Sequence, residues 1–163
     1  MTTAEDVIRA AIANGVTLAT AESCTGGLIG GALTSVSGSS KAFLGGVVTY
    51  SNTSKTEILS VEETLITKHG AVSKAVAAQM ADNVRQRFGS DYAVSATGIA
   101  GPTGGSAEKP IGTVFIGLAD RDGSRAYHYH FDGADRETVR EKTVAASLRH
   151  LHDAIESQAG NIG

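Results

Sequence analysis

Residues 16–36 read VTLATAESCTGGLIGGALTSV. The apolar run Val16–Thr20 is suited to a buried strand, and the small, polar residues 21–27 are typical of a turn. Residues 28–36 then predict a helix, although two internal glycines each lower its stability by roughly 1 kcal/mol relative to alanine. A strand that passes through a short turn into a helix is the repeating unit of an α/β fold.

The same alternation of strands and helices continues on both sides of this stretch. On its N-terminal side, Thr3 and Asp6 predict the cap of a helix that Gly15 ends. On its C-terminal side, strands are predicted at residues 43–51, 92–97, 113–119 and 125–131, and helices at residues 55–59, 62–68, 73–88 and 135–155. Helices separate the first three strands and a turn joins the last two, so we expect a three-layer α/β/α fold with a mostly parallel, mixed sheet.

The composition limits the class of protein. A length of 163 residues fits one domain, and we expect a single domain over residues 1–163 with its core at about 5–155. Hydrophobic residues make up 41% and only two residues are proline, which argues against disorder and against a collagen helix. The net charge of −3 argues against non-specific nucleic-acid binding. There is no apolar run long enough for a membrane helix, no secretory signal pattern and only one cysteine, so we expect a cytoplasmic protein.

Glycine is concentrated in two regions. Seven of the 20 glycines fall in residues 26–46 and six in residues 98–117. Neither the GxxxxGK[ST] phosphate loop nor the GxGxxG dinucleotide pattern is present, which argues against a nucleotide triphosphatase or a Rossmann dehydrogenase. A glycine turn that opens a helix can present free N–H groups to an anion, or it can serve close packing. The pattern alone leaves both interpretations open.

A serine, a tyrosine and a lysine form a candidate catalytic group. Ser40 lies in a glycine–serine turn, Tyr50 ends a predicted strand, and Lys55 lies in the first turn of a predicted helix. A serine becomes a nucleophile when a base removes its proton, and a lysine can be that base if burial leaves its amine neutral. Tyr50 could pass the proton or orient the amine. The ordinary alternative is a turn serine, a strand-end tyrosine and a solvated lysine.

Other polar residues carry weaker signals. Cys24 could be a thiolate at a helix N-terminus, but a small buried thiol is the interpretation we favour. His128 and His130 share one strand face without an evident third ligand, so we expect no metal site. Thr97 ends a strand and opens a glycine-rich loop, where ligands commonly bind in α/β sheets. Arg136 begins the last helix, where a cation opposes the helix dipole, and it could pair with a neighbouring acid or bind a phosphate.

Five ordered motifs together resemble one known family. They are TAESCTGG (20–27), GSS (38–40), VVTYSNTSK (47–55), HGAVS (69–73) and SATGIAGPTGGSAEKPIGTV (95–114). They look like the C-terminal domain of the CinA (competence/damage-inducible protein) family, over about residues 5–155. The resemblance implies an amidohydrolase that converts nicotinamide mononucleotide and water to nicotinate mononucleotide and ammonia.

The resemblance also implies roles for particular residues. The family's serine nucleophile falls on Ser40, its tyrosine on Tyr50 and its lysine on Lys55. Substrate-binding positions fall on Ser23, Thr25, Thr97, Gly98 and Arg136, the last as a phosphate partner. No cofactor and no metal are implied. The two glycine-rich regions are then interpreted as loops whose bare backbone lets a nucleotide come close.

Expectations about partners follow in the same way. The larger N-terminal domain of many family members is not in this sequence, so we expect the stand-alone form. We expect a small-molecule nucleotide as substrate, no nucleic-acid or membrane partner, and a homo-oligomer such as a dimer. Two alternatives stay open: a non-catalytic nucleotide- or partner-binding module, which needs no contact between Ser40 and Lys55, and an amidohydrolase for a different small amide.

Overall fold

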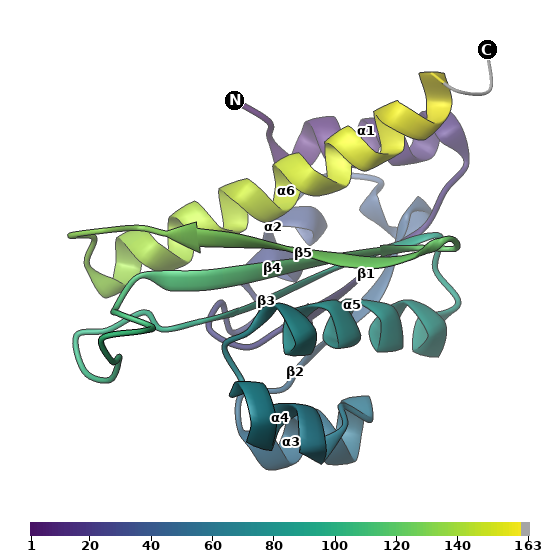
Figure 1. The fold of residues 1–163 in the computed structure, drawn as a ribbon. Coiled ribbons are helices and arrows are strands. Elements are labelled where there is room, and N and C mark those ends of the chain that lie inside the picture. The colour runs from purple at the N-terminus through teal and green to yellow at the C-terminus, as the bar shows by residue number, and fades with distance from the viewer. Residues whose placement is uncertain (161–163) are drawn as a thin grey trace.

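The computed structural model describes residues 1–160 and contains one five-stranded sheet with helices on both faces (Figure 1). Its elements follow in the order α1 Ala4–Asn14, β1 Leu18–Glu22, α2 Leu28–Thr34, the 3₁₀ helix η1 Ser39–Lys41, β2 Phe43–Val48, α3 Asn52–Leu59, α4 Glu63–His69, α5 Lys74–Phe88, β3 Tyr92–Gly98, β4 Thr113–Asp120, β5 Gly123–His130 and α6 Arg136–Gly160. Within these described residues, none of the helices combines the length and apolar composition that a bilayer crossing requires. The predicted α/β fold is confirmed.

The sheet is mixed, as predicted. Its strand order is β2-β1-β3-β4-β5, and β1 runs parallel to both β2 and β3. β4 and β5 are antiparallel to their neighbours, so only the first three strands form the parallel part. Because parallel strands end on the same side, the residues that follow β1, β2 and β3 emerge at one edge of the sheet.

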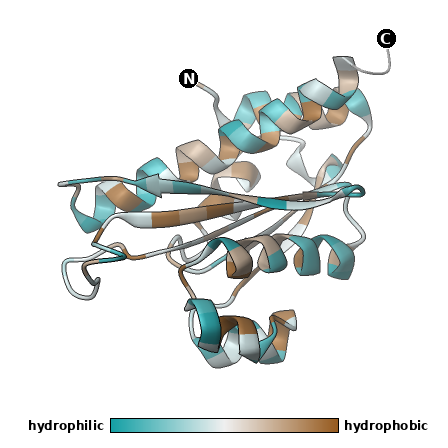
Figure 2. Ribbon diagram, in the orientation of Figure 1, coloured by the Kyte–Doolittle hydropathy of each residue, from teal (hydrophilic) through white to brown (hydrophobic). Residues whose placement is uncertain are grey.

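Helices cover the two faces of the sheet unequally (Figure 1). α1, α2 and α6 lie on one face, where α6 contacts β3 and β4. α5 lies across the other face against β1, β3 and β4, and α3 and α4 pack beside it. Nearly every residue of β1, β3 and β4 is buried between these layers, and Figure 2 shows how apolar the central strands are. The core therefore lies on both faces of the three central strands.

Helix ends follow the sequence signals. Thr3 and Asp6 form the expected capping box of α1, and Gly15 ends that helix with a φ of 64°. Ser73 caps α5 through the N–H of Val76, and Gly89 ends it. The predicted apolar face of α5 is buried, as shown by Val76, Ala77, Met80, Ala81 and Val84.

Several boundaries differ from the prediction. β2 ends at Val48 rather than Ser51, and α3 begins at Asn52 rather than Lys55. β1 begins at Leu18 rather than Val16 and continues to Glu22, because the parallel ladder with β2 and β3 extends through residues 21 and 22. α6 continues to Gly160 instead of ending near Ile155. The remainder of the expected frayed tail, residues 161–163, lies outside the described residues.

Some glycines serve packing within the protein. A Cβ atom on Gly46 would lie 2.1 Å from Thr20 Oγ1 on the neighbouring strand. A Cβ atom on Gly117 would lie 2.1 Å from the carbonyl oxygen of Ala77, so this glycine lets α5 approach β4 closely. Part of the glycine excess is thus explained by contacts between strands and helices, and the interpretation that these regions let a nucleotide come close stays a prediction.

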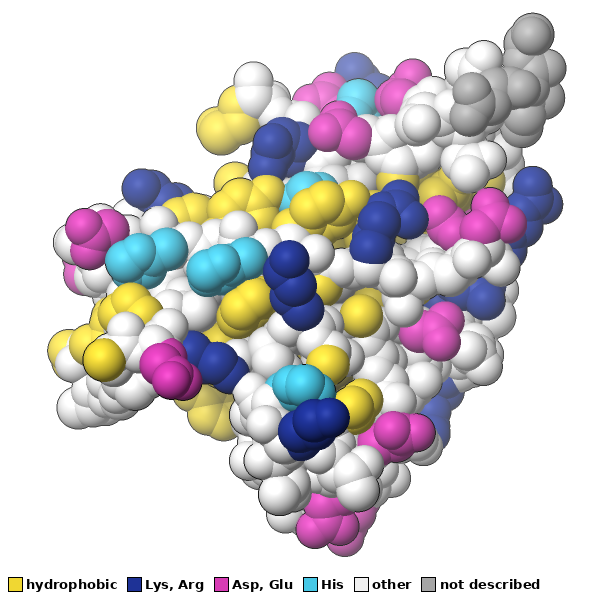
Figure 3. All heavy atoms as spheres, in the orientation of Figure 1, with side chains coloured by type: hydrophobic (Ala, Val, Ile, Leu, Met, Phe, Trp, Pro, Cys, Tyr) yellow, Lys and Arg dark blue, Asp and Glu magenta, His cyan; other side chains and the backbone are white. Residues whose placement is uncertain are grey.

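Charged side chains are mixed on the surface. On the face shown in Figure 3, Lys and Arg side chains are interspersed with Asp and Glu side chains rather than gathered into one basic patch.

Candidate functional site

Three parallel strands bring their carboxyl ends together at one edge of the sheet. Glu22, the last residue of β1, pairs with Val48 of β2 and with Ala96 of β3. Ser23 follows directly and donates its N–H to the carbonyl oxygen of Ala96 at 2.9 Å. Ser23 is therefore fixed at the centre of this edge, where ligands bind in many α/β sheets.

α3 places a lysine at the same edge. Ser51 caps this helix by accepting the N–H of Ser54 at 3.0 Å. Lys55 and Leu59 are one turn apart and both are buried, so they form the inward face of the helix. Lys55 is only 1% exposed, which is unusual for a lysine.

The Lys55 amine is surrounded by hydroxyl and carbonyl oxygen atoms. Its Nζ lies 2.9 Å from Ser23 Oγ, 2.8 Å from the Thr49 carbonyl oxygen and 3.2 Å from the Tyr50 carbonyl oxygen. No ion pair within residues 1–160 includes this lysine. Burial lowers the pKa of Lys55 from 10.5 to about 8. In the neutral amine the two N–H groups can donate to the two carbonyls, which leaves the lone pair to accept the Ser23 hydroxyl proton.

The structure does not bring Ser40 to Lys55. Ser40 is exposed in η1, before β2 begins, whereas Lys55 follows the end of β2. β2 has six residues, so at about 3.3 Å per residue it separates the two side chains by roughly 20 Å. The expected contact between Ser40 and Lys55 was wrong, and Ser23 makes that contact instead.

Tyr50 also differs from the expectation. It meets Lys55 through its backbone carbonyl, and its side chain is 62% exposed. Its hydroxyl accepts a hydrogen bond from Arg136 Nη2 at 3.2 Å, while Arg136 Nη1 donates to the carbonyl oxygen of Gly101 at 2.8 Å. Because Lys55 contacts Ser23 directly, the Tyr50 hydroxyl does not lie between them, and the expected role of Tyr50 as relay or orienter stays a prediction. Tyr50 and Arg136 instead form a pair at the edge of the site.

A cavity of about 170 Å³ opens beside these groups. Six of the residues expected at the site line it, namely Ser23, Tyr50, Lys55, Thr97, Gly98 and Arg136. Thr97 is buried and donates its hydroxyl to the carbonyl oxygen of Ala71 at 3.0 Å. Thr25 does not line the cavity: it is fully buried, and its Oγ1 has no hydrogen-bond partner among the described residues.

The glycine turn that opens α2 is already occupied by a carboxylate. Glu22 is 2% exposed, and its two carboxylate oxygens accept the N–H groups of Ile29 at 2.9 Å and Gly30 at 3.0 Å. These are the helix-start donors that a bound anion would otherwise use. Of the two interpretations of this turn, the structure supports close packing.

Cys24 is a buried thiol, as favoured from the sequence. Burial raises its pKa from 9.0 to about 11, so the reactive thiolate is scarce near neutral pH. His128 and His130 are exposed on β5. Neither they nor any other histidine lines the cavity beside Ser23.

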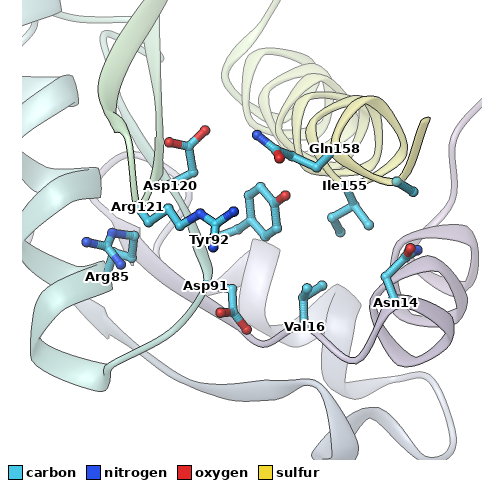
Figure 4. A pocket seen from close by; sticks show the side chains of 10 residues that line it. Asn14, Val16, Arg85, Asp91, Tyr92, Asp120, Arg121, Ile155 and Gln158 are labelled. Carbon is cyan, nitrogen blue, oxygen red and sulfur yellow. The ribbon is translucent and has the colours of Figure 1, made fainter. Parts of the chain in front are cut away.

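Of two other cavities, one adjoins this site and the other lies away from it. One of about 760 Å³ lies between the glycine-rich loop after β3 and the loop before α6, and it shares Ala100 and Arg136 with the smaller cavity. It extends the site outward from Ser23. Another, of about 190 Å³, lies at the opposite edge of the sheet, where Tyr92 begins β3 and Asp120 ends β4 (Figure 4). None of the residues expected at the site lines this one.

Sequence reasoning missed two residues near Ser23. Asn52, the first residue of α3, lines the cavity. Arg140 donates from Nε to the carbonyl oxygen of Cys24 at 3.0 Å and from Nη2 to that of Thr25 at 3.4 Å. The signal for Arg140 was its spacing, because residues four apart lie on one helix face and Arg136 was already a candidate.

Comparisons with known proteins identify the family of this chain. Residues 1–155 match the model of the CinA C-terminal domain family. A CinA-like protein of Geobacter sp. (strain M21) is 53% identical over 142 residues, which cover 87% of this chain and 34% of that protein. A CinA-like protein of Geotalea uraniireducens (strain Rf4) is 54% identical over 143 residues, covering 88% and 34%. The chain thus spans about a third of the length of these relatives.

Solved structures agree in fold and sequence. The competence/damage-inducible protein CihA from Agrobacterium tumefaciens is 41% identical with a TM-score of 0.87, over 94% of this chain and 95% of that one. A CinA superfamily protein from Klebsiella pneumoniae is 34% identical with a TM-score of 0.90, over 94% and 96%. With a matching family model, close relatives and matching solved structures, this chain belongs to the CinA C-terminal domain family.

Proposed function

We propose that the chain is an amidohydrolase that releases ammonia from the carboxamide of nicotinamide mononucleotide, with Ser23 as nucleophile and Lys55 as its base. The observation that carries this proposal is the 2.9 Å contact between the Lys55 amine and Ser23 Oγ in a buried site. A buried lysine with a lowered pKa and no carboxylate partner is costly for stability and suited to proton transfer. The family resemblance supports the substrate.

The first half of the reaction forms an acyl-enzyme. The neutral Lys55 amine takes the Ser23 hydroxyl proton while Oγ bonds to the carboxamide carbon and the C=O π pair moves onto oxygen. When this tetrahedral intermediate collapses, the C=O bond re-forms and the C–N bond breaks. The Lys55 ammonium returns its proton to the leaving nitrogen, which departs as ammonia.

The second half restores the enzyme. A water molecule adds to the acyl carbon and gives its proton to Lys55, so a second tetrahedral intermediate forms. Its collapse breaks the bond to Ser23 Oγ, which takes the proton back from Lys55. The product is the carboxylic acid, which ionises to nicotinate mononucleotide in water.

The adjoining cavities support a substrate larger than a free amide. In the proposal the carboxamide lies in the smaller cavity beside Ser23, and the ribose phosphate extends into the larger one. Arg136 lines both cavities and holds an exposed guanidinium there. An arginine can bind a phosphate through two parallel hydrogen bonds.

Arg136→Ala is expected to weaken substrate binding far more than it slows chemistry. Loss of a charge-assisted hydrogen bond of about 1.5–3 kcal/mol corresponds to a KM rise of roughly 10–100-fold. Steady-state kinetics on nicotinamide mononucleotide measure this effect. Nicotinamide riboside, which lacks the phosphate, is the matched control, and its KM should change little. An equal loss on both substrates would show that Arg136 does not bind the phosphate.

Activity is expected to rise with pH through about 8. The folded pKa of Lys55 is lowered to about 8, and only its neutral form accepts the Ser23 proton. Below this pH each unit of acidification should lower kcat/KM by about tenfold, and above it the curve should level. Stopped assays of ammonia release across about pH 6–10 measure the profile. A flat or falling profile would mean that the ammonium form is the active one.

Three substrates assayed side by side separate this proposal from its alternatives. Ammonia release from nicotinamide mononucleotide, but not from nicotinamide or glutamine, is the expected result. Release from another amide alone would keep the mechanism and change the substrate. No release from any amide, with nucleotide binding retained, would favour a non-catalytic binding module.

A further inference from the structure

The turn that carries Ser23 contains two backbone N–H groups without a backbone acceptor. Ser23 N–H donates to Ala96 O, and Ser23 O accepts the N–H of Gly26 at 3.1 Å. The N–H groups of Cys24 and Thr25, inside this turn, have no backbone carbonyl as acceptor within the part of the chain that the structure describes. Buried backbone donors are rarely left unpaired, because each costs about as much as a lost hydrogen bond.

Arg140 holds the same turn through two of its carbonyl groups. It reaches from α6 and donates to the carbonyl oxygens of Cys24 and Thr25 at 3.0 and 3.4 Å. No carboxylate in residues 1–160 forms an ion pair with this guanidinium. The half-buried Arg140 thus donates hydrogen bonds to the two carbonyl groups that directly follow the nucleophile in the chain.

A second unpartnered group lies in the turn. Thr25 Oγ1 is fully buried and has no partner in the described structure, although a buried hydroxyl normally finds one. Unpaired donors directly after a nucleophile are the arrangement that stabilises an oxyanion, the negatively charged oxygen of a tetrahedral intermediate.

We propose that Arg140 is a positioning residue that holds the turn so that the N–H of Cys24, a residue that lines the cavity beside Ser23, receives the oxyanion. This inference rests on the proposed function, because it concerns the intermediate that Ser23 forms. The charge accumulates on the former carbonyl oxygen when the π pair moves onto it, and it is released when the C–N bond breaks. The unpaired guanidinium of Arg140, behind the turn, adds a favourable field for that charge.

Arg140→Met and Arg140→Lys test the inference against Arg149→Met. Arg149 is exposed on the same helix and contacts Tyr129, so its loss removes an equal charge away from the turn. We expect kcat to fall by about 100-fold for Arg140→Met, because a turn that is no longer held in place loses most of the effect of its oxyanion donor, and by about tenfold for Arg140→Lys. KM should change by less than about threefold and the pH midpoint should stay at about 8, because binding and Lys55 are untouched. Arg149→Met should match the wild type.

A wild-type kcat in a folded Arg140→Lys protein, or a loss expressed in KM, would overturn the inference. Labelling of Ser23 by a fluorophosphonate, followed by intact mass, separates this failure from failure of the proposed function. Slower labelling in the Arg140 variants alone would support the inference even if nicotinamide mononucleotide were not the substrate. Equal labelling of all variants would refute it, and no labelling of the wild type would refute Ser23 as nucleophile together with the inference.

Discussion

Ser23→Ala is expected to reduce ammonia release from nicotinamide mononucleotide by about 10⁴-fold or more. The substitution removes the atom that bonds to the carboxamide carbon, and no neighbouring group can replace it. Cys24 is a poor substitute, because burial raises its pKa to about 11. The fold should survive, since within residues 1–160 the Ser23 hydroxyl is hydrogen-bonded to Lys55 alone. Initial rates and a thermal melt of the same sample measure the two effects.

Ser40→Ala is the matched control for this prediction. Ser40 is exposed at the other edge of the sheet, so the variant should retain wild-type activity. The opposite pattern, with full activity in Ser23→Ala and loss in Ser40→Ala, would return the nucleophile to the position that the motifs alone implied.

Lys55→Met is expected to lower kcat by about 10³-fold, within the range for loss of a general base. Methionine approximates the volume of the buried stem and carries no group that can accept a proton. Residual activity should lose the rise through about pH 8, because that rise reports the Lys55 amine. Steady-state rates across the pH range measure both changes.

Lys68→Met, on the exposed surface of α4, is the control for removing a lysine. It should keep both the rate and the pH profile of the wild type. If Lys55→Met retained a profile that rises through about 8, another group would be the base.

The fold could be predicted from local signals because those signals agree with the tertiary structure. Thr3 and Ser73 cap their helices, and Gly15 and Gly89 end them in the left-handed region, as their residue types favour. The end of β1 was harder to predict. Glu22 continues the strand because β2 and β3 pair with it on both sides, which no local propensity expresses.

The site could be predicted in part. Tyr50, Lys55, Thr97 and Arg136 line one cavity as expected, but the serine that contacts Lys55 is Ser23 rather than Ser40. A signal for Ser23 was present, since it follows a predicted strand, as Tyr50 does, and parallel strands end at one edge. Ser40 precedes its strand and therefore belongs to the opposite edge. The spacing of residues along the chain does not show at which edge of the sheet a residue lies. That requires the direction of each strand.

The role of Arg140 required the structure. Arg140 lies 116 residues after Cys24. Its proposed role rests on its hydrogen bonds to two carbonyl groups, which form only when α6 packs against the turn. The contact between Glu22 and the start of α2 also required the structure. The Glu22 carboxylate, seven residues before Ile29, accepts the N–H groups that the glycine turn suggested for a bound anion. Both facts depend on how strands and helices pack rather than on residue type.

The most direct test of the central claim is to locate the acyl group during turnover. The wild-type protein is mixed with nicotinamide mononucleotide, quenched in acid within one turnover, and digested for peptide mass mapping. The account predicts the nicotinate mononucleotide acyl group as an ester on Ser23. An acyl group on Cys24 or Ser40, or full ammonia release with Ser23 unmodified at every quench time, would contradict it.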